Sequence, residues 1–200
     1  MKSKRPGVLI FVISGPSGSG KTTLAELLLK HRSLKNKLLK SVSLTTRPRR
    51  QEEKAGEDYF FVSENVFKKL KLSKKILEWT RYLGYYYGTP KSFVDKHLAA
   101  GKHLVMCLDV KGALRVKKLY PHNTVTVFVV PPTLEGLRYR IQKRSEVCAS
   151  EINKRLAEAK KEIALIGLYD YQVVNKDLEE ARKCLRDIVL KEIKAQSKKE

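Results

Sequence analysis

The sequence predicts an α/β fold in which helices cover a parallel, layered β-sheet. Five short apolar runs have the composition of strands buried on both faces: residues 8–14, 38–44, 103–109, 124–130 and 171–174. Segments with apolar residues every three or four positions alternate with these runs and predict helices: residues 22–31, 91–100, 112–119, 133–143 and 178–192. Because strands and helices alternate, we expect a parallel sheet with right-handed crossovers.

Length and composition set the broad class. Two hundred residues, 42% of them hydrophobic, suffice for one main domain with a buried core. No apolar run approaches the roughly 20 residues of a membrane helix, and residues 1–6 do not begin a signal peptide. Cys107, Cys148 and Cys184 are odd in number and lack metal-site spacing, which favours free thiols. We therefore expect a cytoplasmic protein with no membrane partner.

The net charge of +21 suits a protein that handles polyanions, and both nucleotides and nucleic acids qualify. Most of this excess is Lys, which usually forms a solvated surface. The sequence has no aromatic platform interleaved with the basic residues and no nucleic-acid-reading motif. We therefore expect no nucleic-acid partner.

A glycine-rich segment directly follows the first apolar run and matches the pattern G-x-x-x-x-G-K-[S/T]: Gly15, Pro16, Ser17, Gly18, Ser19, Gly20, Lys21 and Thr22. Glycines let backbone N–H groups surround the phosphates of a triphosphate, and the next helix adds its positive end. Lys21 would reach the outer phosphates, and the Thr22 hydroxyl would help to hold Mg²⁺. The plain alternative is a Gly/Ser turn between a strand and a helix.

Two stretches interrupt the alternation of strands and helices. Residues 45–90 are dense in Arg, Glu, Gly and Tyr, with a β-like segment at 58–62 and a small helix near 64–71. We interpret this stretch as an inserted subdomain. Residues 131–156 are rich in Arg and interrupted at 145–150, which indicates two helices with a mobile connection, placed where a lid could lie.

The insertion carries side chains suited to an acceptor monophosphate. Arg47 and Arg50 could clamp one phosphate while tyrosyl hydroxyls donate to its other oxygens. Glu78 could accept two hydrogen bonds from adjacent ring and amino donors, as on the Watson–Crick edge of guanine, with Ser43 and Thr89 completing the base contacts. The plain alternative is that the arginines form surface ion pairs with nearby Glu residues and residues 85–87 are packed strand residues.

The chain resembles the guanylate kinases, nucleoside monophosphate kinases that move a phosphoryl group from ATP to GMP. The resemblance covers nearly the whole chain. It rests on the following residues: 15–22, 43–47, 50, 53, 58–59, 78–79, 84–89, 108–109, 112, 131–132, 140, 144, 155, 173–175 and 177–178. It implies a three-layer P-loop kinase core with a parallel five-stranded sheet at residues 1–42 and 93–200. It also implies a GMP-binding subdomain at 43–92 and a helical lid at about 131–156.

The resemblance further implies transfer of the γ-phosphoryl group of ATP to GMP, with Mg²⁺, in purine nucleotide metabolism and GMP recycling. Acceptance of dGMP, and a monomer or a homodimer, stay open. One alternative is a related P-loop kinase of another small phosphate acceptor. Another is a non-catalytic guanylate-kinase-like binding module, against which the intact Lys21 and Thr22 argue.

Individual roles follow from the resemblance. Ser43, Glu78 and Thr89 would read the guanine, and Arg47, Arg50, Tyr59 and Tyr87, with Glu53 beside them, would hold the GMP phosphate. Asp109 would lie near the base and the metal. Arg140, Arg144 and Arg155 resemble lid arginines that act in catalysis together with Lys21 and Arg47. Asn175 resembles an adenine-side contact on the ATP, although a turn-forming Asn at a strand end is an alternative.

Three departures from the family pattern mark where local structure should differ. Pro48 is shifted by one position and Glu52 replaces a usual Gly, so Arg49 competes with Arg50 for the clamp position, which the spacing assigns to Arg50. Cys107 stands where the family often has an aspartate, which leaves Asp109 as the acidic candidate. The lid lacks the Gly pair that usually flanks Arg144, which suggests a stiffer hinge.

Overall fold

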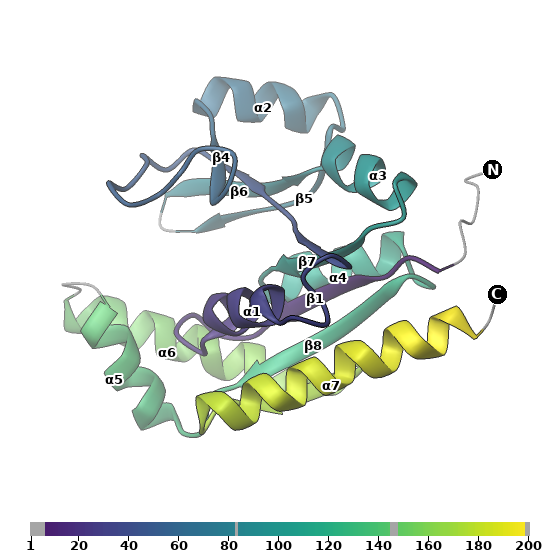
Figure 1. Cartoon of the computed structure of the whole chain (residues 1–200). Helices are drawn as coiled ribbons and strands as arrows, with labels where there is room; N and C mark the ends of the chain where they lie inside the picture. Colours follow the sequence, from purple (N-terminus) through teal and green to yellow (C-terminus); the bar gives the residue numbers. More distant parts are fainter. Residues whose placement is uncertain (1–6, 83, 145–147, 199–200) are drawn as a thin grey trace.

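A five-stranded parallel sheet lies at the centre of the computed structural model, which describes residues 7–82, 84–144 and 148–198 (Figure 1). Its strand order is β2-β7-β1-β8-β9, and every neighbouring pair is parallel. The strands are β1 (Ile10–Ser14), β2 (Leu38–Lys40), β7 (His103–Cys107), β8 (Thr124–Val130) and β9 (Tyr171–Val174). The predicted α/β fold with a parallel five-stranded sheet is confirmed.

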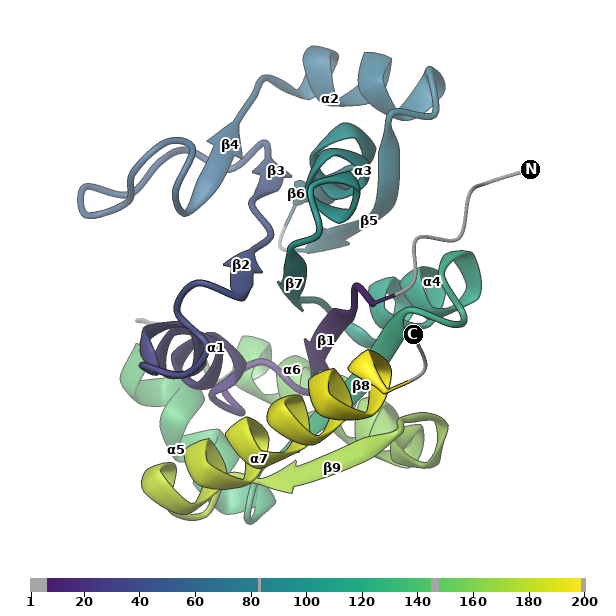
Figure 2. The same ribbon diagram turned by 45° about the vertical axis from the view of Figure 1, so that its right-hand side comes forward.

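Helices cover both faces of this core sheet because its strands are apolar on both sides. One face packs on α1 and α7, as the view of α7 crossing the sheet shows (Figure 2). The other face packs on α3 and α4. Within β1, Phe11 and Ile13 belong to the first face and Ile10 and Val12 to the second, as the two-residue period of a strand requires. The helices are α1 (Lys21–Lys30), α3 (Lys91–Ala99), α4 (Val110–Leu119) and α7 (Leu178–Ser197).

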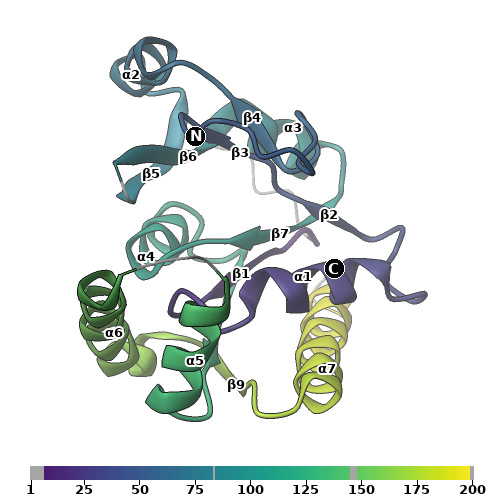
Figure 3. The ribbon, with the colours of Figure 1, turned by 90° about the vertical axis from the view of Figure 1, so that its left-hand side faces the viewer.

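A smaller second sheet with strand order β4-β3-β6-β5 lies beyond α4, with α3 beside it (Figure 3). It is mixed, since β3 pairs in parallel with β4 and antiparallel with β6. Helix α2 packs against it through the fully buried Phe67, whose ring stacks on Tyr86 at 5.2 Å between centroids. The elements are β3 (Ser43–Thr45), β4 (Tyr59–Phe61), α2 (Glu64–Leu72), β5 (Ile76–Tyr82) and β6 (Tyr85–Pro90).

The predicted single strand at residues 38–44 is wrong, because the chain changes sheets inside it. Lys40 pairs with Val105 in the core sheet, whereas Ser43 pairs with Tyr59 in the second sheet. Val42 and Leu44 are both buried, so the alternation of apolar residues continues across the break. A hydrophobic pattern reports burial and does not identify the partner strand, which is why the sequence did not reveal the change.

The helix pair α5 (Leu134–Arg144) and α6 (Ala149–Ala164) packs around its own apolar cluster, which contains Leu137, Ile141, Ile152, Leu156 and Ala159. Helix α6 extends beyond the predicted end of the lid at 156, and a short 3₁₀ helix, η1 (Ile166–Leu168), follows it. Of the predicted connection at 145–150, residues 145–147 lie outside the described residues. Within the described part of the chain, no helix has the length and apolar character needed to cross a membrane.

Candidate functional site

The glycine-rich segment at residues 15–22, which we call the phosphate loop, joins the central strand β1 to α1 at the carboxyl edge of the core sheet. Gly15, Gly18 and Gly20 have φ angles of 134°, 86° and 95°, which L-residues with side chains rarely adopt. A Cβ on Gly15 would lie 2.4 Å from the carbonyl oxygen of Val129. The loop therefore requires glycine both for its backbone angles and for its close packing.

The amino end of α1 differs from those of α2, α4 and α7. Ser63, Asp109 and Asp177 cap those helices by accepting a hydrogen bond from a backbone N–H. Helix α1 instead begins at Gly20, with no side-chain cap and no acidic residue in its first turn. Its first N–H groups are thus left for an anion, which the helix dipole also favours.

Lys21 and Asn175 stabilise the phosphate loop from inside. The ammonium group of Lys21 donates to the carbonyl oxygens of Gly15 and Pro16, at 2.5 and 2.7 Å. The buried side chain of Asn175 donates from Nδ2 to the carbonyl oxygen of Ser19 at 2.7 Å, and a Cβ on Gly20 would lie only 2.3 Å from that nitrogen. Asn175, predicted as an adenine contact, therefore braces the loop.

A cavity of about 320 Å³ opens beside the loop and Asn175. Its lining residues are Gly18, Gly20, Thr23, Arg140, Asn175, Lys176 and Leu178. Arg140 reaches it from α5 and donates from Nη2 to the carbonyl oxygen of Asn175 at 3.1 Å. The structure thus brings one predicted lid arginine to the loop, while Arg144 ends α5 with its side chain outside the described part of the chain.

Arg155, the third predicted lid arginine, lies on α6 and contacts the second sheet. Its guanidinium pairs with Glu151 one turn earlier and lies 5.9 Å from the ring centroid of Tyr82, at the end of β5. Its Nε atom is buried and has no hydrogen-bond partner among the described residues. Arg155 therefore joins the helix pair to the second sheet, whereas Arg140 joins it to the loop.

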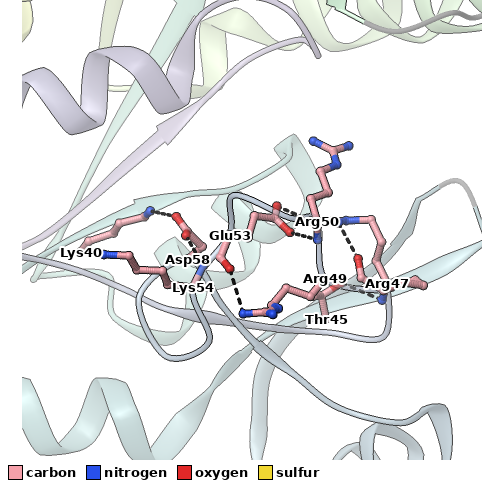
Figure 4. Close-up of polar contacts among 9 residues, drawn as sticks. Lys40, Thr45, Arg47, Arg49, Arg50, Glu53, Lys54 and Asp58 are labelled. Carbon is pink, nitrogen blue, oxygen red and sulfur yellow. Dashed lines mark hydrogen bonds and ion pairs between the residues drawn. The ribbon is translucent and has the colours of Figure 1, made fainter.

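The two arginines predicted to clamp a phosphate lie around Glu53, between β3 and β4 (Figure 4). One carboxylate oxygen of Glu53 accepts from Arg47 Nη2 at 2.6 Å, and the other accepts from the backbone N–H of Arg50 at 2.9 Å. Burial raises the pKa of Glu53, but the bonds from Arg47 and Arg50 outweigh it and hold the pKa below its usual value. Glu53 therefore acts as an ionised bracket between the two arginines.

The side chains of the three arginines in this segment point in different directions. Arg47 is half-buried against the Tyr59 ring, at 5.6 Å from its centroid, and Arg49 donates to the carbonyl oxygen of Glu53. The exposed guanidinium of Arg50 points away from Glu53 and the other side chains drawn in Figure 4, and it carries no dashed contact there. This geometry favours Arg50 over Arg49 as the cation available to a ligand.

Two predicted tyrosines lie beside this bracket. The rings of Tyr59 on β4 and Tyr87 on β6 are 6.0 Å apart, edge to face. Burial lowers the pKa of Arg47, but hydrogen bonds to Glu53 and Tyr87 raise it further than burial lowers it. Arg47, Arg50, Tyr59 and Tyr87 are therefore linked to one another through Glu53 and through ring contacts, and their binding of a phosphate stays a prediction.

The predicted base-reading residues meet where the second sheet faces α4. Glu78 is only 5% exposed, and its Oε1 accepts from the Thr89 hydroxyl at 2.6 Å. Leu44 lies opposite Gly88 in the antiparallel pair of β3 and β6, so Ser43 falls beside Thr89. Burial, reinforced by the nearby charge of Asp109, raises the pKa of Glu78 to about 7 although the Thr89 hydrogen bond opposes this.

Asp109 caps α4 by accepting from the N–H of Gly112 at 2.7 Å. A Cβ on Gly112 would lie 2.8 Å from Glu78 Oε2 and 3.2 Å from Asp109 Oδ1, so both carboxyl groups occupy the space that this glycine leaves. Asp109, predicted to lie near the base, is thus beside Glu78.

Sequence reasoning missed Glu162, a half-buried residue on α6. Burial raises its pKa to about 7, with Lys21 opposing this shift and Asp109 and Glu158 supporting it. Charges on α1, α4 and α6 are therefore close enough to act on one another. Because Glu162 lies in a helix dense in Lys and Glu, its sequence context is that of a solvated face, and only the packing of α6 distinguishes it.

Cys107, at the position where an aspartate was expected, lies against the start of α1. Its Sγ is 3.9 Å from the carbonyl oxygen of Lys21, and burial raises the pKa of the thiol to about 11. A neutral thiol therefore occupies this position. Within the described residues, Cys107, Cys148 and Cys184 are all free.

Comparison with known proteins gives a consistent result. A family model described as guanylate kinase matches residues 8–192. The chain is 41% identical over 192 residues to the guanylate kinase of Wolbachia pipientis wMel, covering 96% of this chain and 94% of that protein. It is 45% identical over 183 residues to the guanylate kinase of Thermotoga maritima, covering 92% and 86%. The crystal structure of guanylate kinase from Anaplasma phagocytophilum, 32% identical, superposes with a TM-score of 0.74 over 94% of this chain and 87% of that one.

Proposed function

Because the chain belongs to the guanylate kinase family, we propose that it transfers the γ-phosphoryl group of ATP to GMP, giving ADP and GDP. The observation that carries this proposal is the pairing of two distinct sites. The phosphate loop, with an uncapped helix and Lys21, suits a triphosphate. The second sheet holds a clustered pair of arginines and a buried carboxyl group, which suit a purine monophosphate.

In the donor half, backbone N–H groups of the phosphate loop and the first turn of α1 bind the phosphates of ATP. Lys21 exchanges its bonds to the carbonyl oxygens of Gly15 and Pro16 for bonds to phosphate oxygens. Arg140 and Asn175 line the adjoining cavity, where the adenine side of the nucleotide fits. Arg144 and Arg155 complete the charge of the lid.

In the acceptor half, Arg47 and Arg50, held by Glu53, bind the phosphate of GMP together with Tyr59 and Tyr87. Glu78 accepts hydrogen bonds from the guanine ring N–H and amino group, and Ser43 and Thr89 contact the rest of the base edge. Asp109 borders this base site. The site draws on side chains from all four strands of the second sheet, Ser43 on β3, Tyr59 on β4, Glu78 on β5 and Tyr87 and Thr89 on β6, so this sheet must be folded for the acceptor site to exist.

The reaction needs no nucleophilic side chain, since the GMP phosphate itself attacks the γ-phosphorus in line. Bringing two anionic phosphates together is opposed by Coulomb repulsion, which the cations of the site offset: Lys21, Arg47, Arg50, Arg140, Arg144 and Arg155. Closure of α5 and α6 over the nucleotides would exclude water, which would otherwise accept the phosphoryl group.

Mg²⁺ fits the residues at the start of α1. Thr22 is exposed in the first turn, next to the uncapped helix end, and offers a hydroxyl oxygen of the kind this ion accepts. Among the described residues, no group of three or more His, Cys, Asp or Glu side chains could hold a metal by itself. Thr22 would therefore share the ion with phosphate oxygens and water, and the ion would neutralise phosphate charge during transfer.

A coupled assay of ADP release tests the proposal at about pH 8, where Glu78 is ionised. The acceptors are GMP, dGMP, AMP, UMP and CMP, each with ATP and Mg²⁺, and each repeated with excess chelator. We expect turnover with GMP that the chelator abolishes, and the dGMP arm decides whether the ribose hydroxyl is needed. Turnover confined to AMP, or none with any acceptor, would contradict the proposal. A cytosolic location and the choice between monomer and homodimer stay predictions.

A further inference from the structure

Glu78 is buried without a positively charged partner. Its side chain lies on β5, with one oxygen on the Thr89 hydroxyl of β6 and the other over Gly112 of α4. The charged group that faces it is Asp109, at the start of α4, which carries the same sign. Among the described residues, no ion pair of Glu78 with Lys, Arg or His is formed. Ser43, which approaches from β3, is neutral.

The groups behind Asp109 do not neutralise this pair. The charge of Asp109 acts on Glu162 of α6 and on Tyr169, which follows η1, and Lys21 acts on Glu162 from α1. Burial and a like charge both favour the neutral form of a carboxyl group, so near neutral pH Glu78 exists in both protonation states. The residue that reads the base therefore changes its hydrogen-bonding pattern within the physiological range.

The two states of Glu78 suit different purines. An ionised carboxylate only accepts hydrogen bonds, which matches the ring N–H and amino group of guanine and opposes the unprotonated N1 of adenine. A neutral carboxyl group donates one hydrogen bond, which matches adenine N1 and leaves its carbonyl oxygen as an acceptor. The hydroxyls of Ser43 and Thr89 donate or accept as the ligand requires, so neither of them enforces the choice.

We propose that the protonation state of Glu78 sets which purine monophosphate the acceptor site takes: GMP when the carboxyl group is ionised, and AMP when it is protonated. AMP is then a second ligand of the same site under acid conditions. This inference rests on the proposed function, because it takes the second sheet to be the monophosphate site.

The test measures the affinities of GMP and AMP by titration calorimetry, without ATP, from about pH 5.5 to 8.5. The phosphate group also titrates near pH 6, but it does so in both ligands and cancels in the ratio of their affinities. Since one ligand needs the ionised form and the other the neutral form, we expect the preference for GMP over AMP to fall roughly tenfold for each unit that the pH is lowered.

Two variants control the test. Glu78→Gln cannot titrate, so its ratio of affinities should not change with pH. Glu64→Gln removes an exposed carboxylate from α2 of the same subdomain and should keep the pH dependence of the unmodified protein. Calorimetry of the unmodified protein in two buffers of different ionisation enthalpy also measures how many protons are released or taken up when a ligand binds. Because the phosphate contributes equally to both counts, the number of protons released with GMP should exceed the number released with AMP by about one at any given pH.

The outcomes separate the inference from the function on which it rests. A ratio that stays constant within about threefold over three pH units, while GMP binds saturably, contradicts the inference and leaves the proposed function standing. A Glu78→Gln protein whose ratio still varies tenfold per unit also contradicts it. If GMP binds to no form of the protein at any pH, the proposed function itself fails. The proton count needs no variant, so poor folding of Glu78→Gln would not block the test.

Discussion

The phosphate loop and the second sheet handle phosphate groups by different means. The loop uses backbone: its glycines place N–H groups where side chains would collide, and Asn175 holds one of its carbonyl groups. The second sheet uses side chains: Arg47 and Arg50 come from the segment between β3 and β4 and Glu78 comes from β5, and the charge of Glu78 is set by burial and by Asp109. The loop should thus be sensitive to shape, and the second sheet to charge and pH.

The largest effect on activity is expected from a substitution of Lys21, the one cationic side chain in the phosphate loop. Lys21→Ala removes a charge that offsets phosphate repulsion, and we expect the turnover number to fall by about 10³-fold or more. The loop loses the two hydrogen bonds from Lys21 to Gly15 and Pro16, but the buried core lies in other residues, so the fold should persist. Turnover with ATP and GMP, together with the thermal unfolding midpoint, checks both statements.

Lys30→Ala is a matched control, because it removes an exposed lysine from the last turn of the same helix, at the opposite end from the phosphate loop. It should keep turnover within a few-fold of the unmodified protein. Near-normal turnover of Lys21→Ala would show that the loop binds phosphate in a way that does not involve its lysine, and the assignment of the donor half would be wrong.

A smaller effect is expected on stability at Glu78. Its pKa is about 7 in the folded protein and near 4.5 in the unfolded chain, so the folded state binds a proton more tightly. The stability from this site is fully present below about pH 4.5 and is lost as the pH rises to 7. At pH 8 the ionised carboxylate therefore costs on the order of 3 kcal/mol, and Glu78→Gln should be the more stable protein.

Urea unfolding of both proteins at about pH 5 and pH 8 measures this difference. The gain in unfolding free energy from Glu78→Gln should be larger at pH 8 than at pH 5. An equal gain at both pH values would show that Glu78 does not titrate between them. The same variant should bind GMP poorly, so the residue that favours function lowers stability.

The sequence predicted the core better than the second sheet for a physical reason. Strands of the core are buried on both faces, so residues 8–14 and 124–130 form nearly continuous apolar runs, the pattern typical of buried strands in a parallel sheet. The phosphate loop has a fixed spacing because its backbone geometry requires it. The core fold and the position of the phosphate loop between β1 and α1 could therefore be predicted from local sequence.

In the second sheet, the strands are short and half-exposed, and their partners come from distant segments. Residues 43–45 look like a continuation of β2, and nothing local shows that they pair with residues 59–61 and 85–90. The roles of individual arginines were equally hidden. The spacing favoured Arg50 over Arg49, but only the structure shows Glu53 holding the Arg50 backbone while Arg49 contacts the Glu53 carbonyl group.

This difference between neighbouring arginines gives the third prediction. Arg50→Ala removes a cation that is free to contact the GMP phosphate, and we expect the KM for GMP to rise by about 10- to 100-fold. Arg49→Ala removes an exposed side chain that contacts only the protein, so the KM should change by less than about threefold. Steady-state kinetics with GMP varied at saturating ATP measures both. Equal increases in KM for the two variants would mean that the segment binds phosphate through its overall positive charge. A larger increase for Arg49→Ala would show that Arg49, and not Arg50, contacts the GMP phosphate.

The smallest effect is at His103, which gives the core a pH response opposite to that of Glu78. Its Nδ1 accepts a hydrogen bond from the N–H of Leu9 at 3.0 Å, which only the neutral ring can do. Burial, with a smaller contribution from the charge of Lys37, lowers the pKa of His103 below its usual 6.5. The unfolded chain is therefore protonated first, and the stability that this residue contributes is lost as the pH falls below about 6.5.

The expected loss is small, because His103 is partly open to solvent. His103→Asn places a non-titrating oxygen where Nδ1 lies, so the difference in unfolding free energy between the two proteins isolates the titration. That difference, measured by urea unfolding at about pH 5 and pH 7, should favour the Asn variant more at the lower pH. If the difference in unfolding free energy does not depend on pH, the contact between His103 of β7 and Leu9 is not sensitive to acid. The pH dependence of stability would then come from the second sheet and α6.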